Sequence, residues 1–284
     1  MSQSRARPSF PNPADRLVQL VLAAMVILVA ACGAPQDRAT ETEPDRLQQL
    51  FDGAIQVIDL THALSSEGPH WPSASGNPFV YEVRSAHDSG ATSMGAYSTP
   101  EHHGTHIDAP IHSADGQPSV DQLEAGDLFG PIALIDVAEQ CAADADYQLS
   151  RDDILAWETA HGALPAGAVV LMYTGWSQKW SDFDAYKNQD AEGRMHFPGF
   201  SEEAARFLID ERDIRGIGVD TLSADAAVAG FGTHRTINGS GKYQLENVAN
   251  LHLVPQSGAY LIVAPIKIEG GSGGQVRLFA VNPE

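Results

Sequence analysis

The chain has 284 residues, enough for a substantial core in one large domain or two small ones. Hydrophobic residues make up 43% of it and charged residues 19%, an ordinary balance for a globular protein. The formal net charge of -20 argues against a nucleic-acid partner, because phosphate binding needs a basic face.

The N-terminus has the composition of an export signal. Three arginines within the first 16 residues precede an apolar run over residues 17–31. This run is too short for a comfortable membrane span and suits the core of a signal peptide. It ends in LVAAC, which resembles a bacterial lipobox with Cys32 as the lipidated residue. An ordinary signal peptide with a chance cysteine is the alternative.

These features predict three segments. Residues 1–31 are expected to be a lipoprotein signal peptide, residues 32–50 a flexible tether, and residues 51–284 a single folded domain. The protein would then be exported to the periplasmic face of the membrane or to the cell surface, and would touch the membrane only through its lipid anchor. If Cys32 carries lipid, Cys141 has no partner within the chain, so no internal disulfide is expected.

From about residue 51 the pattern alternates between strand-like and helix-like runs, which predicts an α/β domain with a mixed sheet. The expected helices cover residues 150–162 and 201–213, with Ser150 and Ser201 as their N-caps. The expected strands cover residues 55–64, 131–137, 167–176, 214–223, 259–268 and 274–283.

A cluster of histidines follows the first strand. The stretch EHHGTHIDAPIH, residues 101–112, holds four of the chain's 11 histidines. His102, His106, Asp108 and His112 are separated by even intervals, so in an extended chain all four would point to one side. Glycine and proline in the stretch exclude a regular helix.

Two imidazoles and a carboxylate on one side are what a protein offers a divalent metal, which makes His102, His106 and Asp108 candidate ligands. His112, slightly beyond them, can serve as a proton carrier. His103, at an odd interval, would face away. Glu101 and the scattered histidines, His70 among them, are expected to be structural or exposed, and the GGSGG run at 270–274 to be a turn.

At this point the sequence resembles the cyclase-like hydrolase family, which includes bacterial kynurenine formamidases and isatin hydrolases. HHGTHIDAPIH matches the family signature HxGTHxDxPxH. IDLTHAL, HWP, GIGVDTLS, HRTINGSGKYQLENVANL and VAPIKIEGGSG resemble further family segments, so the resemblance covers nearly all of residues 55–282. It implies a swivelling β/β/α fold and assembly into a homodimer or homotetramer.

The resemblance also assigns residues. His102, His106 and Asp108 match the family's first metal ligands, and His112 matches its catalytic histidine. His234 and Glu246 match the pair that completes a second metal position, with Asp108 as the bridge. Trp71 matches an aromatic residue that flanks the substrate; a packed surface aromatic is the alternative reading.

The resemblance implies one or two divalent ions, Zn or Mn, and a small-molecule substrate with a cyclic or N-acyl (aryl formamide-type) amide. A metal lowers the pKa of bound water from 15.7 toward roughly 7, so metal-bound water would attack the carbonyl, with His112 as general base and acid. Both isatin hydrolase-like and arylformamidase-like activities stay open. The alternative from another class is a surface-tethered lipoprotein that uses its metal to bind a ligand without turnover.

Overall fold

The structure is a computed structural model that describes residues 46–72, 76–90 and 92–283. Contacts divide the chain into two compact units, Met1–Gln48 and Gln49–Glu284, and nearly all of the first lies outside the described residues. The expected signal peptide and Cys32 lie outside them as well. Helix α2 (Arg46–Phe51) begins within the stretch expected to be a tether. Within the described ranges, no helix has the length and apolar character needed to cross a membrane.

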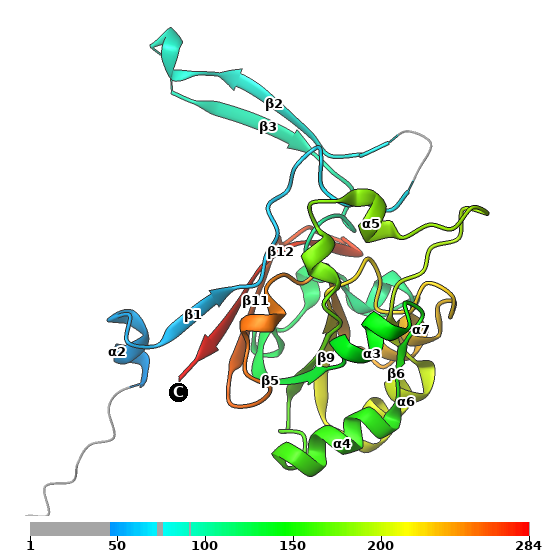
Figure 1. Cartoon of the computed structure of the whole chain (residues 1–284). Helices are drawn as coiled ribbons and strands as arrows, with labels where there is room; N and C mark the ends of the chain where they lie inside the picture. The colour runs from blue at the N-terminus through cyan, green and yellow to red at the C-terminus, as the bar shows by residue number, and fades with distance from the viewer. Residues whose placement is uncertain (1–45, 73–75, 91, 284) are drawn as a thin grey trace, which may run out of the picture. The chain divides into compact units, whose positions relative to one another are not determined.

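The larger unit is built on a sheet of eight strands that closes into a barrel (Figure 1). Closure occurs because the short strand β4 pairs both with β10 and with the first residues of β12. In sheet order the strands are β1 (Gln56–Asp59), β12 (Gly273–Asn282), β11 (Tyr260–Pro265), β5 (Phe129–Asp136), β7 (Ala168–Tyr173), β9 (Ile214–Val219), β10 (Tyr243–Glu246) and β4 (His106–Asp108).

Four neighbouring strands, β5, β7, β9 and β10, run parallel, and the others pair antiparallel. Parallel neighbours need crossover connections, which contain α4 (Arg151–His161), α6 (Glu202–Glu211) and α7 (Gly232–Gly239). Helices α4 and α6 cover one side of the barrel, so every residue of β7 is buried. One apolar core fills the barrel and includes Leu134, Leu171 and Leu278. A second core lies under the helices and includes Trp157 and Phe207.

The remaining helices and strands are short. They are β2 (Val80–Ser85), β3 (Met94–Ser98), α3 (Ala138–Ala143), β6 (Gln148–Leu149), α5 (Phe183–Lys187) and β8 (Gly199–Phe200). β2 and β3 form a separate hairpin that extends from the body (Figure 1).

The structure confirms the expected α/β class and mixed sheet. Ser150 caps α4, and its side chain accepts a hydrogen bond from the backbone N–H of Asp153. Ser201 caps α6 in the same way. Each expected strand overlaps an observed strand, but the first is much shorter than predicted, since only Gln56–Asp59 of residues 55–64 pairs in the sheet. The β2–β3 hairpin, α7 and β10 were not predicted from periodicity. Cys141 is buried and has no disulfide partner among the described residues.

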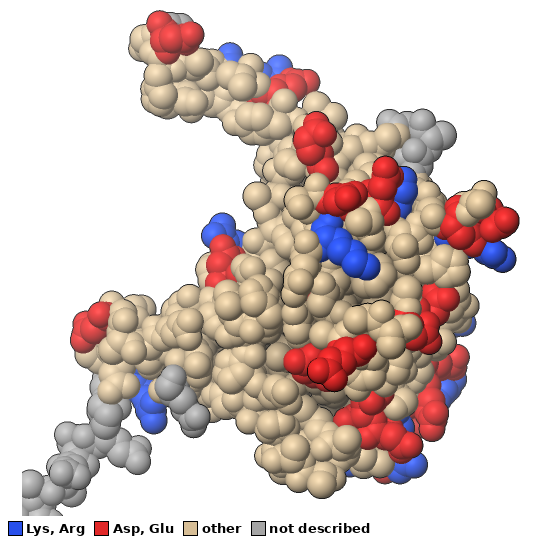
Figure 2. All heavy atoms as spheres, in the orientation of Figure 1, with Lys and Arg blue, Asp and Glu red and all other residues tan. Residues whose placement is uncertain are grey.

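The outer face of β1, β12, β11 and β5 carries an exposed apolar row beside the ion pair of Asp59 and Arg277. Val57, Val281, Tyr260 and Pro131 form one row across four strands. Val57 and Tyr260 are about half exposed. Figure 2 shows the carboxylates mainly on the side that carries α4 and α6. The excess negative charge is therefore unevenly distributed over the face in view.

Candidate metal centre

The histidine-rich stretch is not one extended segment, so that part of the prediction is wrong. β4 contains only His106–Asp108 and is held at both edges by β10 and β12. His106 and Asp108 do lie on one face of the strand, as their spacing of two requires. His102 precedes the strand in a bend, and His112 ends a short 3-10 helix, Pro110–His112. The side chains converge because the chain turns on both sides of β4.

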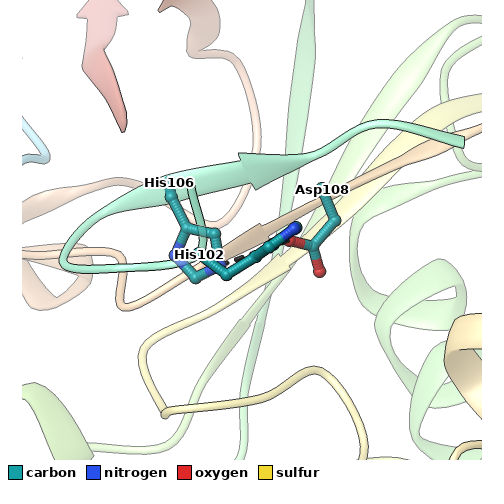
Figure 3. Close-up of side chains that lie close together, drawn as sticks. All are labelled: His102, His106 and Asp108. Carbon is teal, nitrogen blue, oxygen red and sulfur yellow. Dashed lines mark hydrogen bonds and ion pairs between the residues drawn. The ribbon is translucent and has the colours of Figure 1, made fainter. Parts of the chain in front are cut away.

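A glycine turn brings His102 back over the strand. Gly104 has a φ of 66°, in the left-handed region that glycine adopts at little cost. Nδ1 of His102 lies 2.6 Å from Oδ1 of Asp108, and Figure 3 shows the two side chains pointing toward each other. Gly273 on β12 leaves room for the ring, because a Cβ there would lie 2.7 Å from Cε1 of His102.

Glu101 and Ser272 hold the other edge of the His102 ring. The Ser272 hydroxyl donates to Glu101 at 2.5 Å and lies 2.9 Å from Nε2 of His102. Glu101 therefore anchors a candidate ligand rather than simply facing solvent. The glycine-rich run at 270–274 also contributes a residue to the site, and it is a turn only in part, because Gly273 and Gly274 begin β12. Sequence reasoning missed this pair because 171 positions separate the two residues.

His234 and Glu246, which only the family resemblance singled out, lie beside the same carboxylate. His234 is on α7 and Glu246 is the last residue of β10. Nε2 of His234 lies 3.2 Å from Oδ2 of Asp108 and 3.4 Å from Oε1 of Glu246. Nε2 of His106 lies 3.2 Å from Oδ1 of Asp108 and 3.5 Å from Oε2 of Glu246. Asp108 is thus central to the cluster.

Hydrogen bonds at Nδ1 orient the two buried imidazoles. Nδ1 of His106 donates to the carbonyl oxygen of Gly104 at 2.9 Å. Nδ1 of His234 lies 2.5 Å from Oδ2 of Asp225, which also accepts from the backbone N–H of His234. Both rings therefore direct Nε2 toward Asp108. Metal-binding histidines in proteins are commonly held this way. No sequence signal marked Asp225.

The donor set fits a divalent cation. Nε2 of His106 and Oδ2 of Asp108 are buried and, among the described residues, form no hydrogen bond of acceptable geometry. Because Nδ1 of His106 donates to Gly104, a neutral His106 turns the lone pair of Nε2 toward the carboxylate of Asp108. Lone pairs that face one another in a buried site call for a positive charge between them.

The pKa values of the side chains in the cluster also indicate a site that favours positive charge. Burial by itself would lower the pKa of His106, but the carboxylates of Asp108 and Glu246 outweigh burial and raise it to about 9. Burial likewise opposes the change at His234, where Asp108, Asp225 and Glu246 together raise the pKa to about 12. The histidines in turn hold the pKa of Asp108 well below its usual value, against the effect of burial.

Ligand atoms of two residue groups lie within 4.8 Å of one another: His102, His106 and Asp108 in one, and Asp108, His112 and His234 in the other. His112 is more exposed than the rest. Its ring centroid lies 3.9 Å from that of His102 and 5.7 Å from that of His234. Burial, with neighbouring Asp108 opposing it, lowers the pKa of His112. A neutral imidazole at the mouth of the cluster can accept a proton.

The cluster opens into a cavity of about 240 Å³ whose lining includes Trp71 and Phe231. Trp71 is 51% exposed, which places it at the rim rather than in a packed core. His70 and His103 also line this cavity, and both are buried. The expectation that His103 faces away is therefore wrong. The chain leaves the extended conformation before β4, so alternation of side chains does not apply at position 103.

Comparison with known proteins agrees with this site. Residues 58–226 match the family model Cyclase, described as "Putative cyclase". The chain is 34% identical to an isatin hydrolase of Roseibium aggregatum over 252 residues, 83% of this chain and 95% of the relative. It is 30% identical to a kynurenine formamidase of Bacillus cytotoxicus over 230 residues, 79% of this chain and 96% of the relative.

The fold of the chain also matches that of solved structures. A crystal structure of an isatin hydrolase bound to the product analogue thioisatinate matches with a TM-score of 0.79 and 33% identity, covering 84% of this chain and 96% of that one. With a family match over more than half of its residues and relatives matched almost end to end, the chain belongs to the cyclase family of metal-dependent hydrolases.

Proposed function

We propose that the protein hydrolyses a cyclic or N-acyl aryl amide with the help of one or two divalent ions, Zn or Mn. The observation that carries this proposal is the buried cluster around Asp108, whose carboxylate lies within 3.2 Å of nitrogens from His102, His106 and His234. The named activities of the isatin hydrolase and kynurenine formamidase relatives support the reaction class.

Metal binding and proton transfer are assigned to different residues of the site. His102, His106, Asp108, His234 and Glu246 would hold the ions, with Asp108 between the two positions. A divalent ion supplies an activated water and polarises the amide carbonyl. His112 takes a proton from the attacking water and delivers it to the leaving nitrogen. General acid–base help of this kind contributes about 100- to 10,000-fold in rate.

The cavity sets the size and character of the substrate. A volume of about 240 Å³ suits a small molecule. Trp71 and Phe231 are both more than half exposed, and both line the cavity, where they offer aromatic surface to an aryl ring. An aryl amide or lactam therefore fits better than an aliphatic amide of the same length.

Purified protein should be mixed with isatin or with N-formylkynurenine, with and without Mn or Zn, while the absorbance is followed. The proposal expects metal-dependent turnover of at least one substrate, lost on dialysis against a chelator and restored by the ion. A protein that binds these compounds but never converts them would instead support the alternative, a lipoprotein that binds its ligand without turnover.

We propose further that Cys32 is lipidated and anchors the protein to the membrane after export. The apolar run over residues 17–31 and the LVAAC sequence support this placement. Cys32→Ser should abolish palmitate labelling and membrane fractionation, and unchanged labelling would contradict the assignment.

We also propose a homodimer or homotetramer. Exposed Tyr81, Val83 and Tyr97 on the β2–β3 hairpin and the apolar row on the barrel's outer face support self-association. An isolated two-stranded hairpin is at best marginally stable, and large exposed apolar patches usually mark interaction surfaces. Sedimentation of the purified protein measures the assembly.

A further inference from the structure

A second cavity adjoins the cavity over the metal cluster. Its volume is about 450 Å³, against about 240 Å³ for the first cavity. Trp71, Ser223 and Phe231 line both cavities, so the two meet along these residues. The candidate metal ligands line the first cavity and not the second. A molecule held at the metal cluster can therefore extend past Trp71 and Phe231 into the second cavity.

The volumes of the two cavities indicate that a ligand uses both. Cavities that bind small molecules in proteins typically measure about 300–1,000 Å³. The first cavity, at about 240 Å³, lies below this range, and the second, at about 450 Å³, lies within it. The space open to a ligand at the metal cluster is therefore larger than the first cavity alone.

The wall of the second cavity is fixed by buried residues and backbone hydrogen bonds. Phe197 and Ala226 line it and are almost fully buried. The backbone N–H of Ala227 donates to the carbonyl oxygen of Phe197 at 3.0 Å, and the N–H of Phe200 donates to that of Ala224 at 2.8 Å. These bonds join the segment before α7 to β8 and its approach. The second cavity therefore has a built wall that exists before a ligand arrives.

The lining of the second cavity suits an uncharged apolar group. Met195 and Val228 add aliphatic surface to that of the shared aromatic residues. The charged residues among the described lining are Arg194 and Asp225, and both are already paired. Arg194 donates to the carboxylate of Asp190 at 2.8 Å, and the carboxylate of Asp225 accepts from two backbone N–H groups of α7. A group that enters this cavity gains chiefly by leaving water.

We propose that the second cavity binds the acyl chain of the substrate, so that the preferred substrates are N-acyl aryl amides with an acyl chain of several carbons. This inference rests on the proposed amide hydrolysis and names the substrate class. The aryl ring and the amide occupy the first cavity, and the chain follows Trp71 and Phe231 into the second. Hydrolysis adds one water across the amide bond and gives an aliphatic carboxylic acid and an aryl amine.

The test compares two ligands that differ in the acyl chain alone, formanilide and N-hexanoylaniline. Dissociation constants are measured for both on the Mn-loaded full chain, by stopped-flow fluorescence quenching before turnover. Ala227→Phe places a ring in the second cavity, because Ala227 lines that cavity and not the first. Ala229→Phe is the matched control, since it makes the same substitution in the same segment at an exposed residue that lines neither cavity.

The wild type should bind N-hexanoylaniline at least about tenfold more tightly than formanilide, because each methylene that leaves water contributes about fourfold in affinity. Ala227→Phe should bring this ratio close to one by weakening the hexanoyl ligand, while Ala229→Phe keeps it. Metal content by elemental analysis should be the same in all three proteins. If Ala227→Phe does not fold, Val228→Trp narrows the same cavity from an exposed position and decides the question.

Two results would overturn the inference. One is a wild-type ratio near one. The other is an Ala227→Phe protein that keeps the ratio or weakens both ligands equally, which would mean that the chain does not enter the second cavity. The proposed function fails separately. A protein that selects the longer chain through Ala227 but hydrolyses no amide keeps this inference and loses the catalytic one. A protein that hydrolyses amides without any preference for chain length does the reverse.

Discussion

The Nδ1 atom of His234 lies 2.5 Å from the carboxylate of Asp225. The same carboxylate accepts from the backbone N–H groups of Thr233 and His234 at the start of α7. One aspartate therefore fixes both the first turn of the helix and the direction of the imidazole that the helix carries. Nδ1 of His106 instead donates a hydrogen bond to a neutral group, the carbonyl oxygen of Gly104. The two imidazoles of the cluster are thus supported unequally.

Asp225→Asn should weaken metal binding at the position that His234 serves. An asparagine has one oxygen, so it cannot accept from all three N–H groups at once, and the ring loses its orientation. Loss of such a supporting carboxylate typically costs about 10- to 100-fold in metal affinity. Competition with a chromophoric chelator measures it. Asp210→Asn makes the same charge change on the exposed face of α6 and is the control. Equal affinities in the two variants would show that Asp225 does not support the ligand.

Periodicity and capping residues predicted the helices α4 and α6 and the buried strand β7, because these elements are long and their apolar spacing is regular. The metal cluster was predictable in part, because His106 and Asp108 lie two apart on one strand. The positions of the other residues of the cluster could not be predicted from their spacing in the sequence. His102 reaches the site through a turn at Gly104, where the alternation of side chains ends.

The supporting residues were beyond the reach of sequence patterns for a different reason. Ser272 contacts Glu101 across 171 positions, and Asp225 reaches His234 across nine positions of mostly irregular chain that lead into α7. The sequence prediction placed His103 on the wrong side because the chain bends before β4 and side chains no longer alternate there. For the same reason, the even spacing of His102 placed it correctly only by chance. The Ser272–Glu101 contact depends on barrel closure through β4 and β12, which single-strand patterns do not encode.

Metal-free protein should lose stability as the pH rises from neutral. The pKa of His106 is raised to about 9 in the fold, above its value of about 6.5 in an unfolded chain. A raised pKa contributes stability that is fully present below 6.5 and is lost as the pH rises through about 9. His234, with a pKa of about 12, stays protonated over this window. Thermal unfolding of chelator-treated protein between pH 6.5 and 9.5 should therefore show a falling midpoint.

Metal should reverse the trend, because ligands must lose their protons before an ion binds. Protein with excess Mn or Zn should gain affinity for the ion over the same pH range and keep its unfolding midpoint. A chelator-treated protein whose midpoint rises between pH 6.5 and 9.5 would contradict the charge assignment at His106.

Gly273→Ala should damage both the barrel closure and the site. The new Cβ would lie 2.5 Å from the carbonyl oxygen of Ile107 and 2.7 Å from His102. Overpacking of this kind costs about 1–3 kcal/mol. Gly126→Ala is the matched control, since nothing lies within 4 Å of the corresponding Cβ. Thermal unfolding and metal content should both fall for Gly273→Ala only. Equal unfolding midpoints in the two variants would mean that β12 and β4 can separate without cost.

The role of His112 can be separated from that of a ligand by comparing it with His106. His106 is buried with its Nε2 between two carboxylates, whereas His112 is exposed at the end of a 3-10 helix. His106→Ala should therefore lose metal. His112→Ala should fold normally and keep near-stoichiometric metal, while its hydrolysis rate falls at least about 100-fold, the lower end of what acid–base help contributes.

The two roles of His112 must be distinguished by experiment, because its ligand atom lies within 4.8 Å of those of Asp108 and His234, where it could reach an ion. Elemental analysis and steady-state rates on the same preparations distinguish the two roles. A proton carrier leaves the metal in place and removes about 3 to 5 kcal/mol of transition-state stabilisation. Replacement of a metal ligand instead causes loss of the metal. A His112→Ala protein that is metal-free, or that turns over near the wild-type rate, would refute the proton-transfer role.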